Sequence, residues 1–136
     1  MGALAAAQLD AAIAALATVE VPAFAFPLER LGAFPNLQRP RIVWLGATRP
    51  QPAFRICAAA VQQAFAPLGV SFDRAPDARP HVTLGRLRPG ASVLALTFRP
   101  RIPPLVRAGA LTLFSSLPDG PTTRYEALYE HRLPLQ

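Results

Sequence analysis

The chain is poor in the residues that form cross-links or hold metals. Its 136 residues include one cysteine, Cys57, only two histidines and no lysine. A single cysteine excludes an internal disulfide and a site built from several thiolates, so the expected compartment is a reducing cytoplasm. With so few thiolate and imidazole ligands, we expect no metal and no other cofactor.

The absence of lysine means that all fourteen basic residues are arginine, against eight acidic residues and a formal net charge of +6. A basic balance favours anionic partners such as nucleic acid. The alternative interpretation is that a GC-rich genome produces an excess of alanine, arginine and proline without any link to function. Net charge alone does not separate the two interpretations.

Long apolar runs are also absent. The opening Met1–Ala7 is apolar, but no basic leader precedes it, and Gln8 and Asp10 interrupt it. We therefore expect neither a secretion signal nor a membrane span, and no membrane partner. The hydrophobic content of 51% nevertheless excludes a disordered chain, and this length suits one domain over residues 1–136.

Apolar spacing predicts two helices, over residues 5–19 and 51–65. Strands are predicted over residues 23–28, 41–46, 81–86, 105–115 and 123–133, with loops at 31–36 and 71–80 and a turn at 117–121. Residues 91–96 are compatible with a helix or a strand. In the last strand, alternation puts Tyr125, Ala127, Tyr129 and His131 on one face. Two helices and about five strands predict an α+β domain.

Residues 79–86, Arg-Pro-His-Val-Thr-Leu-Gly-Arg, are typical of a short buried strand entered through a proline. Alternation places the imidazole of His81 and the hydroxyl of Thr83 on one face, and we expect Arg86 to share it. An imidazole that exchanges a proton near neutral pH, a hydroxyl donor and a permanent cation suit a phosphate ester. The alternative is a core strand with a satisfied histidine and a solvent-exposed arginine.

This stretch resembles the second His-x-Thr signature of the two-histidine (2H) phosphoesterase superfamily. The resemblance is greatest to the RNA 2′,3′-cyclic phosphodiesterases, also called 2′-5′ RNA ligases. Residues 31–35 followed by 41–46 are similar to the middle region of that family, and residues 113–116 and 124–128 to its closing hairpin. The resemblance implies a bilobal fold of small antiparallel sheets with helices outside, in which each lobe offers one motif to a shared cleft.

The resemblance also implies an activity and its residues. His81 and Thr83 would be catalytic, with His81 as general base, and Arg86 would bind the phosphate. The reaction implied is hydrolysis of RNA 2′,3′-cyclic phosphate ends to 2′-phosphates without a metal, with 2′-5′ ligation as its reverse. The expected partner is therefore RNA or a nucleotide with a 2′,3′-cyclic phosphate.

The chain departs from the family in lacking the first His-x-Thr motif, because its other histidine, His131, stands in no such motif. Met1–Ala3 followed by a helix matches the family's junction just after that motif. We therefore expect a domain without its N-terminal elements, impaired in catalysis and prone to self-association through the surface thereby exposed. Ala78 is a second departure, because the family often has an aromatic side chain there as a wall of the base pocket.

Two other functions are compatible with the same residues. One is a non-catalytic RNA-binding module that retains half a site. The other is an interaction domain whose basic charge reflects codon usage alone. A phosphodiesterase of RNA ends is the function that the motifs favour.

Overall fold

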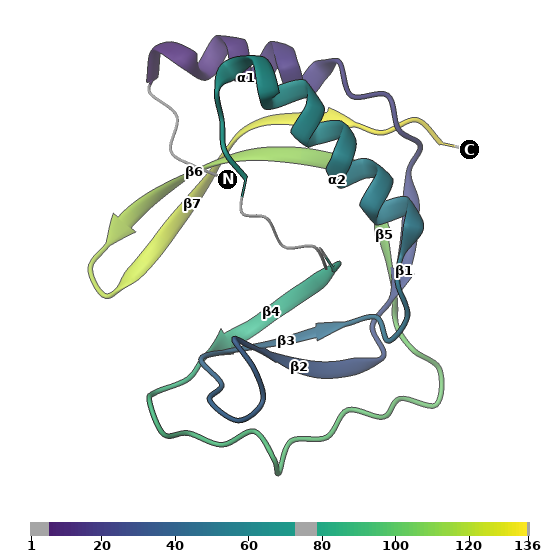
Figure 1. The fold of residues 1–136 in the computed structure, drawn as a ribbon, viewed down its shortest axis with the longest axis vertical. Helices are drawn as coiled ribbons and strands as arrows, with labels where there is room; N and C mark the ends of the chain where they lie inside the picture. Colours follow the sequence, from purple (N-terminus) through teal and green to yellow (C-terminus); the bar gives the residue numbers. More distant parts are fainter. Residues whose placement is uncertain (1–5, 73–78, 136) are drawn as a thin grey trace. The chain divides into compact units, whose positions relative to one another are not determined.

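The computed structural model describes residues 6–72 and 79–135. The elements are η1 (Ala6–Gln8), α1 (Leu9–Ala17), β1 (Phe24–Pro27), β2 (Arg30–Phe34), β3 (Ile42–Gly46), α2 (Pro52–Phe65), η2 (Ala66–Leu68), β4 (His81–Arg86), β5 (Leu105–Ala108), β6 (Ala110–Asp119) and β7 (Thr122–Arg132). The strands form three small sheets, β1–β5, β2–β3–β4 and β6–β7, and the last two are antiparallel (Figure 1). The predicted α+β class is confirmed. Among the described helices, none is long and apolar enough to cross a membrane.

Contacts along the chain divide it into two compact units. The first unit comprises Met1–Phe24, Ile56–Pro76 and Ala108–Gln136, and the second comprises Ala25–Arg55 and Asp77–Arg107. Each unit is therefore assembled from segments that are distant in the sequence.

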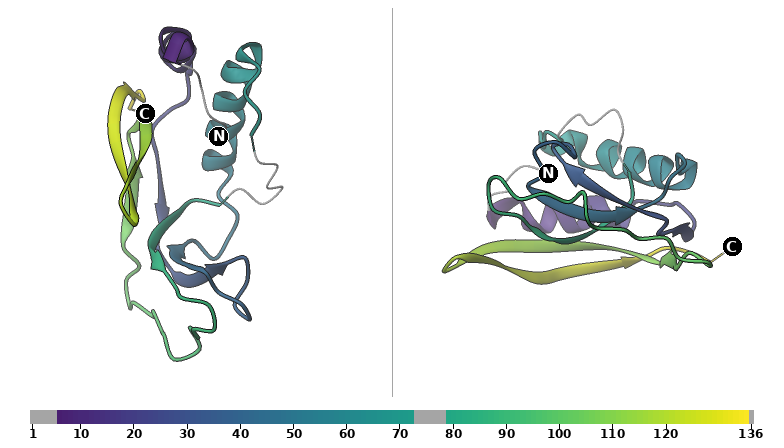
Figure 2. Two further views of the ribbon diagram at one scale, coloured as in Figure 1. Left: turned by 90° about the vertical axis from the view of Figure 1, so that its left-hand side faces the viewer. Right: turned by 90° about the horizontal axis from the view of Figure 1, so that it is seen from below.

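The first unit has a core made by its helices and its hairpin. Alanine-rich α1 buries Ala12 and Leu16, four residues apart on one helix face, and α2 adds Cys57 and Phe65. These side chains cluster with apolar residues of the β6–β7 hairpin, and the helices lie on one side of it (Figure 2). Both helices confirm the predictions from apolar spacing.

The β6–β7 hairpin turns at Gly120, whose φ of 59° is one that glycine adopts without strain. Its register shifts at Leu113, which pairs with Tyr129, whereas the next residue, Phe114, pairs with Ala127. Leu128 is thus an extra, bulged residue, and it moves Tyr125 and Ala127 to the face opposite Tyr129. The predicted single face of four residues is therefore wrong, because it assumed unbroken alternation.

The hairpin also exposes several large apolar side chains to solvent: Phe114, Leu117, Tyr125 and Leu128. Exposed apolar surface of this kind favours association. The expectation of self-association stays a prediction.

His131 has a structural role in this unit. Its Nε2 atom donates a hydrogen bond of 2.8 Å to the carbonyl oxygen of Val19, which lies two residues after the end of α1. We expect His131→Ala to lower the free energy of unfolding by about 1–3 kcal/mol, because a partly buried carbonyl loses its donor. Urea unfolding measures this loss. Arg132→Ala is the matched control, since that side chain is 88% exposed, and an equal loss in both variants would contradict the assignment.

Cys57 is buried in the same core, and burial raises the pKa of its thiol. The thiolate is the reactive form, so the folded protein both shields the sulfur and keeps it protonated. We expect labelling by a thiol-specific disulfide reagent near neutral pH to be at least about tenfold slower in the native than in the denatured protein. Equal labelling rates would show that the sulfur is accessible.

The second unit contains the sheet β2–β3–β4 (Figure 1). Its central strand, β3, confirms the predicted buried strand, with Val43 and Trp44 both buried. Residues 30–34 form β2 and not the predicted loop, and Gly32 pairs with Trp44. A glycine in this stretch favours a loop by propensity. In the structure, the missing side chain of Gly32 leaves space that the indole of Trp44 on the paired strand fills.

β4 confirms the strand predicted at residues 81–86, but the prediction that it is buried is wrong. Val82 is 41% exposed and Leu84 is 55% exposed. The reason is position, because β4 is an edge strand whose partner in the described sheet is β3. Residues 91–96 form neither a helix nor a strand, and the strand predicted at 105–115 is divided into β5 and β6 at Gly109.

Candidate functional site

The candidate site lies on one face of the β2–β3–β4 sheet. His81 pairs with Gly46 of β3, and Thr83 pairs with Trp44. Paired residues of antiparallel strands share a face, so both motif side chains stand on the Trp44 side of the sheet. Unbroken alternation from Thr83 would turn Arg86 to the other face.

A β-bulge brings Arg86 back to the motif face. Val43 pairs with Gly85 and Ile42 pairs with Arg86, which leaves Leu84 as the extra residue of β4. Ile42 lies two residues from Trp44 and shares its face. The structure therefore places Arg86 on the face that the sequence prediction gave it, but through a bulge that the sequence pattern did not reveal.

The imidazole of His81 is exposed to solvent, yet it is held from several sides. Its Nδ1 atom lies 2.8 Å from the carbonyl oxygen of Arg79. The ring of Phe34 packs against it edge-on, with centroids 5.1 Å apart and planes at 84°, and the indole of Trp44 lies 5.9 Å away. These contacts restrict the orientation of the ring before any ligand arrives.

Two glycines make room for the indole beside His81. Trp44 Cζ2 and Cη2 occupy the space that a side chain at Gly32 would need. A Cβ at Gly46 would lie 2.8 Å from Trp44 Cζ3 and 3.0 Å from the carbonyl oxygen of Pro80. Neither position tolerates a side chain without displacing Trp44, which is why both glycines matter to the geometry around the imidazole.

Trp44 is 5% exposed, and the guanidinium carbon of Arg30 lies 5.6 Å from its ring centroid. A buried indole covered in this way packs the site and offers no open face to a nucleobase. Phe34 is 39% exposed, so it is the aromatic side chain next to His81 that a ligand can touch. The sequence analysis did not identify Phe34 and Arg30 as site residues. Both are in β2, which is brought near the motif only by strand pairing, and a linear pattern does not show that pairing.

The hydrogen bond at Nδ1 determines what the other ring nitrogen can do. A carbonyl oxygen only accepts, so we assign the proton of the neutral ring to Nδ1. Nε2 then carries a lone pair, and an imidazole with a free lone pair can remove a proton from water. Thr83 adds a hydroxyl donor about 7 Å along the strand, and Arg86 adds a cation.

Other predicted features lie elsewhere or outside the described residues. His131 belongs to the other unit and uses Nε2 to hold Val19. Within residues 6–72 and 79–135, no cluster of three His, Cys, Asp or Glu residues could hold a metal ion. The junction at Met1–Ala3 and the substitution at Ala78 fall outside the described residues.

Comparisons with known proteins agree on one family. A family model described as the 2′-5′ RNA ligase superfamily matches residues 2–120. The chain is 32% identical over 120 residues to an RNA 2′,3′-cyclic phosphodiesterase of Aeropyrum pernix, a match that covers 85% of this chain and 68% of that protein.

Solved structures show the same fold. The crystal structure of E. coli LigT complexed with 3′-AMP has a TM-score of 0.73 at 26% identity, and the match covers 98% of this chain and 72% of that one. A crystal structure described as a phosphoesterase has a TM-score of 0.72 at 23% identity, over 98% and 72% of the two chains. TT0787 of Thermus thermophilus has a TM-score of 0.68 at 19% identity, over 99% and 75%. The last two likenesses concern the fold alone.

Proposed function

The chain belongs to the 2′-5′ RNA ligase superfamily, and we propose that it hydrolyses 2′,3′-cyclic phosphates at RNA ends to 2′-phosphates. The observation that carries the proposal is the grouping of His81, Thr83 and Arg86 on one sheet face, with the imidazole tied through Nδ1. The phosphodiesterase of Aeropyrum pernix supports the same substrate class.

In the proposed reaction, His81 is the general base. Its Nε2 takes a proton from a water molecule, and the water oxygen forms a bond to phosphorus. The bond between phosphorus and O3′ breaks, O3′ takes up a proton, and the phosphate stays on O2′. The carbonyl of Arg79 stabilises the imidazolium that forms, because it accepts from the Nδ1–H of either ring form.

Thr83 and Arg86 act on the non-bridging phosphate oxygens. The Thr83 hydroxyl donates to one oxygen, and the Arg86 guanidinium neutralises the charge that builds up as water attacks. The same site joins RNA ends with a 2′,5′ linkage when a 5′-hydroxyl takes the place of water: His81 takes its proton, its oxygen bonds to phosphorus, and the bond to O3′ breaks as before.

The departing O3′ also needs a proton, and this chain carries one motif histidine. His131 is engaged with Val19, so we propose that solvent water supplies the proton. General acid catalysis by a positioned side chain is typically worth about 10²–10⁴-fold. A site with one positioned imidazole is therefore expected to be slower than a site with two by a factor of this size.

A second candidate function follows from the same observation. A sheet face with one imidazole, one hydroxyl and one cation also suits a module that binds RNA phosphates without turning them over. The two functions differ in product formation.

The experiment is to incubate the protein with an oligoribonucleotide that ends in a 2′,3′-cyclic phosphate and to separate the products by chromatography. We expect a 2′-phosphate that accumulates in proportion to enzyme concentration. Binding of the oligonucleotide with no product above the enzyme-free blank would overturn the enzyme proposal in favour of the RNA-binding module.

A further inference from the structure

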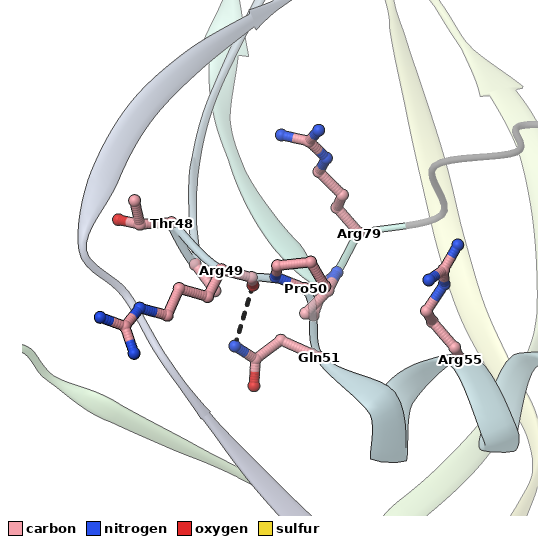
Figure 3. A pocket seen from close by; sticks show the side chains of 8 residues that line it. Thr48, Arg49, Pro50, Gln51, Arg55 and Arg79 are labelled. Atoms are coloured by element: carbon pink, nitrogen blue, oxygen red, sulfur yellow. Dashed lines mark hydrogen bonds between the residues drawn. The ribbon is translucent and has the colours of Figure 1, made fainter.

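An arginine-lined pocket lies beside the motif strand, wholly within the second unit (Figure 3). It is formed where β3 ends, where α2 begins, and where the chain enters β4. The lining side chains that matter here are Thr48, Arg49, Gln51, Arg55, Arg79 and Pro80. The lining does not include His81, Thr83 or Arg86, although Arg79 and Pro80 come directly before them in the chain.

The pocket gathers positive charge from three separate segments. Arg49 comes from the connection after β3, Arg55 from α2, and Arg79 from the residues just before β4 (Figure 3). Among the described residues that line it, none is acidic. Guanidinium groups are permanently charged and present donors that match phosphate oxygens, so neighbouring arginines suit a bound phosphate.

Local hydrogen bonds fix the backbone around this pocket. Gln51 Nε2 donates to the carbonyl oxygen of Arg49 at 3.0 Å, and the backbone N–H of Thr48 donates to Glu29 Oε2 at 2.6 Å. Glu29 is not one of the lining residues, and its carboxylate accepts this hydrogen bond. The two hydrogen bonds tie the segment after β3 to itself and to the residue before β2.

The pocket is directly connected to the candidate catalytic residue. Arg79 lines it and also holds the imidazole of His81 through its carbonyl oxygen. Arg79 stands two residues before His81 in the chain, and Pro80 between them also lines the pocket, so the pocket and the imidazole are built on one short segment. A phosphate in the pocket and a phosphate at His81 can thus belong to one strand.

We propose that this pocket binds the phosphodiester on the 5′ side of the terminal nucleoside while its cyclic phosphate lies at His81. The inference rests on the proposed function, and it names the preferred substrate as an oligoribonucleotide end rather than a mononucleotide. Binding is electrostatic and independent of sequence, because backbone phosphates carry no base information.

The test uses the full chain and the double variant Arg49→Gln/Arg79→Gln. Glutamine removes the charge but keeps the backbone carbonyl that holds His81. Arg124→Gln is the matched control, because that exposed arginine lies on β7 in the other unit. Fluorescence anisotropy with a labelled tetraribonucleotide that ends in a cyclic phosphate measures the Kd, and circular dichroism checks that each variant is folded.

We expect the double variant to bind the tetranucleotide at least about tenfold more weakly than the control variant. The slope of log Kd against log salt should also become shallower by about 0.7 for each phosphate that the variant no longer neutralises. Equal affinities and slopes in the two variants would overturn the pocket assignment. If the double variant is unfolded, the single Arg49→Gln variant gives the same comparison at about half the slope change.

The product assay keeps this inference distinct from the proposed function. If the wild type hydrolyses the substrate and the double and control variants bind equally well, the pocket assignment is wrong and the enzyme proposal stands. If the double variant loses affinity for the tetranucleotide but the wild type hydrolyses nothing, the pocket assignment is supported and the enzyme proposal is wrong.

Discussion

Replacing His81 with alanine is expected to lower the rate of cyclic-phosphate hydrolysis by about 10²–10⁴-fold, the usual worth of a positioned general base. In the proposed mechanism, Nε2 of this ring deprotonates water, since Nδ1 donates to the carbonyl oxygen of Arg79. The side chain is exposed, so we expect the fold to survive its removal. Initial rates on a cyclic-phosphate-terminated oligonucleotide measure the effect.

The control is His131→Ala, which removes the other imidazole from the chain. His131 bonds to Val19 and has no part in the site, so its variant should lose stability but keep its rate per folded molecule. Opposite effects of the two substitutions would separate catalysis from folding. Equal rates in His81→Ala and the wild type would remove His81 from the mechanism.

Gly32→Ala is expected to destabilise the second unit by at least about 2 kcal/mol, because it forces an extra methyl group into a packed contact. The new Cβ would overlap the indole of Trp44, and that indole has Phe34 and His81 beside it. Displacing Trp44 would also change one of the ring contacts that orient the imidazole of His81. We therefore expect lost activity together with a lower midpoint of urea unfolding.

Gly85→Ala is the matched control in β4 of the same sheet. Nothing lies within 4 Å of a Cβ at that position. Its free energy of unfolding should change by less than about 1 kcal/mol in either direction. A Gly32→Ala protein as stable as Gly85→Ala would show that Trp44 does not occupy the space above Gly32.

Periodic apolar spacing was enough to predict both helices and the strand that carries the motif, and a continuous apolar run predicted the central strand β3. It failed at β2, because Gly32 in that segment favours a loop by propensity and only the packing of Trp44 makes it a strand residue. It also gave β4 a buried environment, whereas an edge position leaves Val82 and Leu84 exposed. Sheet order is a tertiary property that a single strand's sequence does not contain.

In the site, too, the sequence pattern predicts which residues are present better than it predicts which way their side chains face. The motif identified His81 and Thr83, but the position of Arg86 depends on a bulge at Leu84, just as the faces of β7 depend on a bulge at Leu128. An extra residue reverses every side chain beyond it, and no local pattern marks either leucine. Phe34 enters the site through cross-strand register, which also lay beyond the sequence pattern.

The role of His81 is tested most directly by ¹⁵N NMR of the histidine side chains, because the chain has only two. In the neutral ring form, His81 should carry its proton on Nδ1 and His131 should carry it on Nε2. Addition of a 2′,3′-cyclic nucleotide should shift the signal of the unprotonated Nε2 of His81 and leave His131 unchanged. A proton on Nε2 of His81, or a nucleotide that moves neither of its nitrogen signals, would contradict the assignment of this imidazole as the general base.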